Sequence, residues 1–134
     1  MLHRFDTLAG HPVARAAFWG CCAVITTLAL LPAQDLSPLL FNWWDKAQHA
    51  LAFAVLTTLG LLAYPHRPAL AVGGGLLALG GAIEIAQLLS GWRQGDWQDG
   101  LADGVGILCI LLIHRLLQGN NIKRRPLEAG LDAQ

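Results

Sequence analysis

Three short groups of polar residues stand at the edges of apolar segments, and they contain most of the side chains that could do chemistry. In the first group Asp45 and His49 are four residues apart, and in the second Glu84 and Gln87 are three apart. Residues at these spacings share one face of a helix. The third group is a run of acidic residues that opens the last apolar segment. Together the candidates for one polar pocket are Asp45, Lys46, His49, Glu84, Gln87, Arg93, Asp96, Asp99 and Asp103.

A histidine beside several carboxylates indicates two kinds of chemistry. The imidazole can act as a general base with the carboxyls as acids, or the oxygens and the ring nitrogen can hold a divalent cation such as Mg²⁺, Mn²⁺ or Zn²⁺. Lys46 and Arg93 could contact a phosphate headgroup. A structural role is the alternative to these chemical roles for two of the acids, because Asp96 and Asp99 stand where they could cap a helix.

The composition indicates that lipid is the solvent for much of the surface. Of the 134 residues, 54% are apolar and 13% are charged, with a mean hydropathy of +0.47. Soluble domains have roughly 25% charged residues. The net charge is zero and no basic stripe with interleaved aromatics is present, so no nucleic-acid partner is expected.

Four apolar segments predict an all-α membrane protein, a bundle of four transmembrane helices. The segments are residues 13–31, 47–64, 69–89 and 100–117. Each has the length of about 17–25 residues that crosses a hydrocarbon core of ~30 Å. Prolines and glycines separate them. The first segment also resembles a signal peptide, but its length and the poor cleavage site after it favour a retained span.

The distribution of basic residues predicts the orientation. Seven Lys and Arg residues fall on the side of the N-terminus, the 65–68 turn and the C-terminal tail, whereas only Lys46 and Arg93 fall on the other. The positive-inside rule then places both termini in the cytoplasm and the polar groups outside. We interpret residues 1–118 as one membrane domain and 119–134 as a polar cytoplasmic tail.

Glu84 is the acidic residue that a structural role explains least well. It stands about six residues before the end of its segment, so roughly 9 Å inside it. An ionised group in a membrane helix costs about 2.5–3.5 kcal/mol on insertion scales. We therefore predict that Glu84 faces the bundle interior with His49 or Lys46 as its partner, and that Asp45, His49, Glu84 and Asp99 converge in one outward-facing pocket.

Small residues recur every fourth position in the third segment, at Gly74, Ala78, Ala82 and Ala86. Such a ridge lets a neighbouring helix approach closely. We predict that another helix packs along it.

The order of the three polar groups resembles the motifs of the VanZ-like membrane proteins. The family pattern is similar to Asp-Lys-x-x-His, then Glu-x-x-Gln, then Arg-x-x-Asp-x-x-Asp-x-x-x-Asn-x-x-Gly, and the resemblance covers about residues 30–118. Gly106 stands at the final glycine, and Asp103 stands where the family more often has Asn. The family's founding member is linked to teicoplanin resistance. The resemblance implies a bacterial inner-membrane protein with a cell-envelope role, and it implies no particular reaction.

Three functions remain open at this point. The first is a protein whose pocket binds an envelope component, for example a lipid-linked precursor or an anionic lipid headgroup, and thereby affects glycopeptide resistance. The second is a small intramembrane metal-assisted hydrolase or transferase acting on a lipid-linked envelope substrate. The third is a proton or ion path. Against it, the inner half of the bundle has no matching relay, because His114 and Arg115 stand alone near the opposite end. A divalent cation is the one cofactor that the residue types suggest.

Overall fold

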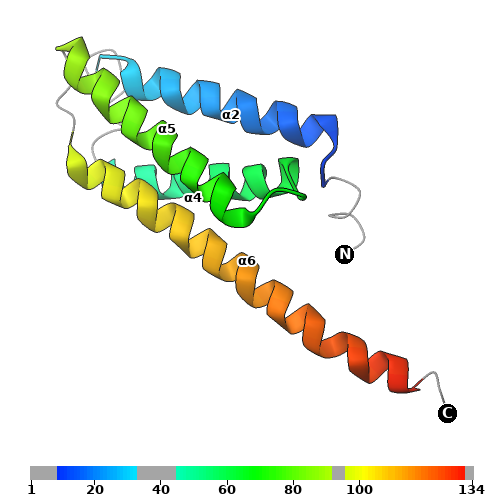
Figure 1. The fold of residues 1–134 in the computed structure, drawn as a ribbon. Coiled ribbons are helices and arrows are strands. Elements are labelled where there is room, and N and C mark those ends of the chain that lie inside the picture. The colour runs from blue at the N-terminus through cyan, green and yellow to red at the C-terminus, as the bar shows by residue number, and fades with distance from the viewer. Residues whose placement is uncertain (1–8, 33–44, 92–95, 132–134) are drawn as a thin grey trace.

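The computed structural model describes residues 9–32, 45–91 and 96–131, and these residues form four α-helices (Figure 1). All four helices are long and apolar enough to cross a membrane. The expected all-helical architecture of four apolar helices is confirmed, and their candidate membrane spans differ by a few residues from the four predicted segments. In chain order the helices are α2 (Pro12–Leu30), α4 (Asp45–Ala63), α5 (Ala69–Ser90) and α6 (Trp97–Leu131).

Local sequence signals explain several helix ends. Pro12 occupies the first turn of α2, where its missing N–H costs nothing, and the His11 ring accepts a hydrogen bond from the Val13 N–H at 3.2 Å. Pro68 precedes α5. Gly91 ends α5 in the left-handed conformation, with φ of 78°, which a residue without Cβ adopts readily.

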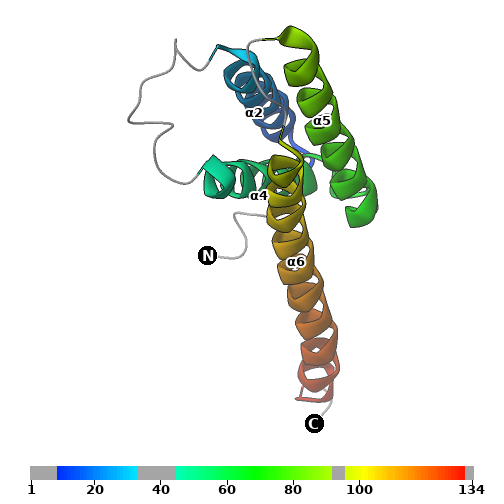
Figure 2. The same cartoon turned by 90° about the vertical axis from the view of Figure 1, so that its left-hand side faces the viewer.

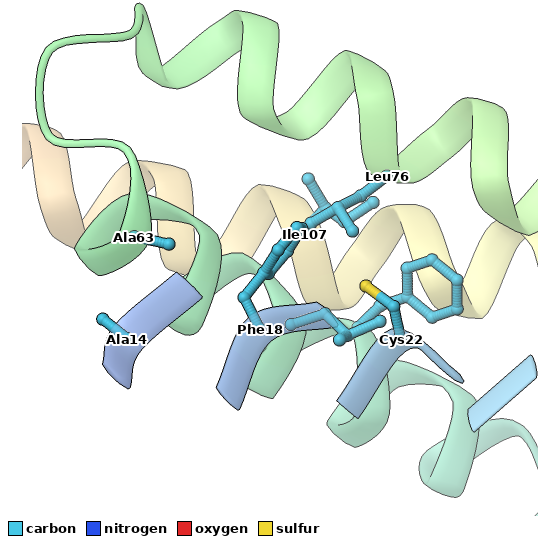
Figure 3. Packing of buried hydrophobic residues seen from close by; sticks show 8 residues of the cluster. Ala14, Phe18, Cys22, Ala63, Leu76 and Ile107 are labelled. Atoms are coloured by element: carbon cyan, nitrogen blue, oxygen red, sulfur yellow. The ribbon is translucent and has the colours of Figure 1, made fainter. Parts of the chain in front are cut away.

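Helix α4 contacts each of the other three helices. The core contains residues from all four helices, including Phe18 and Cys22 of α2, Leu76 of α5 and Ile107 of α6 (Figure 3). Phe53, Leu56 and Thr57 of α4 are the largest fully buried side chains among the described residues. Helix α2 contributes Phe18 and Cys22 to this core.

Two glycines allow α6 to approach its neighbours closely. A Cβ on Gly106 would overlap the backbone carbonyl of Ala50, so α4 and α6 are in backbone contact there. A Cβ on Gly73 would lie 2.9 Å from the Leu111 side chain, so α5 and α6 also meet across a glycine. Small residues at such crossings are typical of membrane helices.

The predicted packing along the 74–86 ridge is wrong. Gly74, Ala78 and Ala82 are exposed, and no atom of another helix lies near the space that a Cβ on Gly74 would fill. The buried face of α5 is instead made of Gly73, Leu76, Gly80, Ile83 and Gln87. A shift of one residue rotates the buried face by about 100°, and the glycines that α6 uses, 73 and 80, lie on this other face.

The helix ends gather at two opposite ends of the bundle (Figure 1). One end holds the start of α2 and the turn between α4 and α5. The other holds the end of α2, the start of α4, the end of α5 and the start of α6, and this end faces the viewer in Figure 2. Helix α6 projects beyond the other helices and runs to Leu131, past the end of its apolar span at Gly119. The expected polar tail is therefore helical as far as Leu131.

Candidate functional site

The first turn of α4 and the first two turns of α6 bring basic and acidic side chains together. Lys46 Nζ donates a hydrogen bond to Asp96 Oδ2 at 2.8 Å and to Asp99 Oδ1 at 3.3 Å. The Lys46 side chain is half exposed, whereas that of Asp99 is 10% exposed. Lys46 therefore closes the solvent side of the cluster, and Asp99 lies beneath it.

His49 lies between two carboxylates of α6. Its Nδ1 is 3.0 Å from Asp103 Oδ1, and its Nε2 is 3.8 Å from Asp99 Oδ2. The side chains of His49 and Asp103 are 18% and 3% exposed. As an imidazolium the ring has a donor on each nitrogen, so it can serve both carboxylates at once. We call Lys46, His49, Asp99 and Asp103 the acid–base cluster.

Asp96 combines a structural role with its ion pair. Its Oδ1 accepts a hydrogen bond from the Gln98 N–H at 3.0 Å, which caps the start of α6. The hydrogen bond from Lys46 lowers the pKa of Asp96 below its ordinary value, and the Gln98 N–H lowers it further. The capping role is thus observed for Asp96, whereas Asp99 and Asp103 make their contacts with α4.

Gly80, which is not among the predicted site residues, provides the space in which the Asp103 carboxylate lies. A Cβ on Gly80 would be 2.7 Å from Asp103 Oδ2 and 3.3 Å from the Phe53 ring. Any side chain at this position would therefore displace Asp103 from between α4 and α5. The available signal was its position four residues before Glu84, which places both on one face of α5.

Glu84 lies one helical turn from Gly80, and its carboxyl group is unusual. Both carboxyl oxygens are buried, and neither has a hydrogen-bond partner within the described part of the chain. The predicted hydrogen bond from His49 or Lys46 to Glu84 is not formed, because neither carboxyl oxygen accepts one from these residues. Glu84 still interacts electrostatically with His49, Asp99 and Asp103, and the backbone N–H of Asp96 lies near its carboxyl group. It therefore belongs to the same end of the bundle as the acid–base cluster without being bonded into it.

The remaining predicted residues lie elsewhere or outside the described residues. Gln87 is buried, and its Nε2 donates to the Ala29 carbonyl at 2.9 Å. This hydrogen bond ties α5 to α2, so Gln87 does not serve the cluster. Asp45 is the first residue of α4, but its side chain and the whole of Arg93 lie outside the described residues.

The balance of charges indicates what the site can bind. Among the side chains that the structure describes, Lys46 and His49 face four carboxyl groups, those of Glu84, Asp96, Asp99 and Asp103. Such a site favours ligands that bring hydrogen-bond donors or positive charge, and a bare phosphate is unfavourable there. Within residues 9–32, 45–91 and 96–131, no three His, Cys, Asp or Glu side chains are arranged to hold a metal ion. These residues do not by themselves form the suggested divalent-cation site.

Comparison of the chain with protein-family models, with curated proteins and with solved structures gave no match.

Proposed function

We propose that this chain is a VanZ-like, multi-pass protein of the bacterial inner membrane whose acid–base cluster opens to the outer side and binds a component of the cell envelope. The observation that carries the proposal is the buried carboxyl of Glu84 beside the acid–base cluster, neither of whose oxygens is hydrogen-bonded to another described side chain. Leaving such a group unsatisfied costs about 1–3 kcal/mol or more. A ligand that donates to Glu84 would recover this cost, so a binding role explains why the carboxyl is there.

The ligand class follows from the donors and acceptors of the site. Amide, hydroxyl and ammonium groups can donate to Glu84 and to the outer oxygens of the acid–base cluster. Sugar and peptide headgroups of lipid-linked envelope precursors carry such groups, and so do glycopeptide antibiotics. A binding role is favoured over a metal-assisted hydrolase, because the described residues hold no arranged metal ligands. The Ser90 hydroxyl is also engaged in a hydrogen bond, because it donates to the Gln87 carbonyl at 2.7 Å.

Deletion of the gene in its host should lower the minimal inhibitory concentration of a teicoplanin-type glycopeptide. A plasmid copy of the wild type should restore it, and a His49→Phe copy should not, because Phe cannot bond Asp103 or Asp99. Immunoblots of membrane fractions would check that the two copies are equally abundant. Unchanged susceptibility to glycopeptides and to other envelope stress after deletion would refute the envelope role.

Reporter fusions test the orientation on which an outward-facing site depends. A fusion after Pro68, in the turn between α4 and α5, should be active only as a cytoplasmic reporter. Fusions near Pro38 and Gly95 should be active only as exported reporters, because the seven-to-two distribution of Lys and Arg retains the first end inside. The reverse pattern would place the cluster on the cytoplasmic side and contradict the proposal.

A further inference from the structure

Two apolar grooves meet at the turn between α4 and α5, at the end of the bundle opposite the acid–base cluster. The first groove, of about 550 Å³, lies between α2 and α5, and the second, of about 440 Å³, lies between α4 and α6. Both volumes are in the range of ligand-binding clefts. Tyr64 and Arg67 line both grooves. The walls are mostly apolar, with Phe18, Leu76 and Leu79 in the first and Leu61, Ile110 and Ile113 in the second.

Polar groups converge where the grooves meet. Arg67 is exposed in the turn. The Arg15 guanidinium lies over the Tyr64 ring, 5.6 Å from its centroid, and its Nε donates to the Ala63 carbonyl at 3.4 Å. Trp19 Nε1 donates to the Tyr64 hydroxyl at 2.8 Å. Because the Tyr64 oxygen accepts this bond, its own proton can be donated to a ligand oxygen.

Charge is distributed so that this end attracts anions. Among the side chains that the structure describes, every acidic one lies at the opposite end, on the second half of α5 or the beginning of α6. No carboxylate in that set competes for Arg15 or Arg67. The guanidinium fork matches phosphate oxygens in pairs, and basic residues at a membrane surface each favour anionic lipid by about 1 kcal/mol.

We propose that this turn is a binding site for an anionic phospholipid, with its phosphate on Arg67 and one acyl chain in each groove. Apolar grooves on both sides of a basic, hydroxyl-bearing turn match the three parts of such a lipid. Phosphatidylglycerol is the simplest lipid of this class. The site is separate from the acid–base cluster, and the proposal does not depend on which side of the membrane the turn faces.

Native mass spectrometry of the purified full chain in detergent tests this site with equimolar phosphatidylglycerol and phosphatidylcholine of identical acyl chains. The wild type should retain phosphatidylglycerol about fivefold more strongly, the ratio expected for about 1 kcal/mol from one basic residue. Arg67→Gln should bring the ratio close to one. Glycerol phosphate at the same concentration should not displace the lipid, because it lacks acyl chains.

A matched pair of glycine variants tests the first groove. Gly75 lines this groove, and the space that its Cβ would fill is empty. Gly75→Leu should therefore project a side chain into the groove from a point where its Cβ meets no neighbour, and reduce phosphatidylglycerol retention several-fold. Gly74→Leu places the same side chain in equally open space outside the groove lining and should bind like the wild type. Equal retention of the two lipids by the wild type, equal retention by the two leucine variants, or displacement by glycerol phosphate would overturn the proposal.

Discussion

Glu84→Gln should abolish the glycopeptide phenotype that the wild type restores to a deletion strain, while the protein inserts at normal abundance. The amide keeps the shape of the carboxyl, but it cannot carry charge or accept and release a proton. Both carboxyl oxygens are buried without a hydrogen-bonded side chain among the described residues. The variant therefore removes no observed side-chain hydrogen bond and changes only the electrostatic interactions with His49, Asp99 and Asp103. Loss of function would therefore report the chemistry of the carboxyl rather than the integrity of the fold.

Asp96→Asn is the matched control for this variant. It makes the same change from acid to amide in the same region, and Asn caps helices about as well as Asp. The Asp96–Lys46 pair is exposed, with side-chain exposures of 40% and 50%, and exposed ion pairs contribute little. The control should retain the phenotype. If Glu84→Gln retained it as well, at equal abundance, Glu84 would act as a helix-packing group, for which an amide is comparable at about 0.6–2 kcal/mol.

Gly106→Ala should lower the free energy of unfolding by about 1–3 kcal/mol, the usual cost of an extra group forced into a packed interior. The new methyl group would meet the backbone carbonyl of Ala50, which cannot move aside as a side chain can. Helices α4 and α6 would separate at a point next to His49 and three residues after Asp103. The variant should therefore also weaken the His49–Asp103 hydrogen bond and the function that depends on it. Thermal unfolding of the purified protein in detergent would measure the first effect.

Gly100→Ala is the control on the same helix. No atom lies within 4 Å of the Cβ that it would add, and alanine favours a helix over glycine by roughly 0.5–1 kcal/mol. The control should melt at the wild-type temperature or slightly above it. Equal melting temperatures for the two alanine variants would show that the close approach at Gly106 is not required for stability.

The sequence by itself determined the helices and the end of the bundle at which polar residues gather. Apolar segments long enough to cross a membrane, separated by prolines and glycines, specify four helices. Antiparallel connection then brings residues 45–49, 84–87 and 96–103 to one end, whatever the details of packing. These features follow from segment length and chain direction.

Only the tertiary structure decided which polar groups pair and which face of α5 is buried. Lipid is as apolar as the helix interfaces, so the apolar pattern does not set how each helix is rotated. The rotation is set by close contacts, such as Gly106 against Ala50 and Asp103 in the space at Gly80. These contacts place the His49 ring beside Asp103 and direct the Gln87 side chain toward α2. They leave the buried carboxyl of Glu84 without a hydrogen-bonded side chain among the described residues.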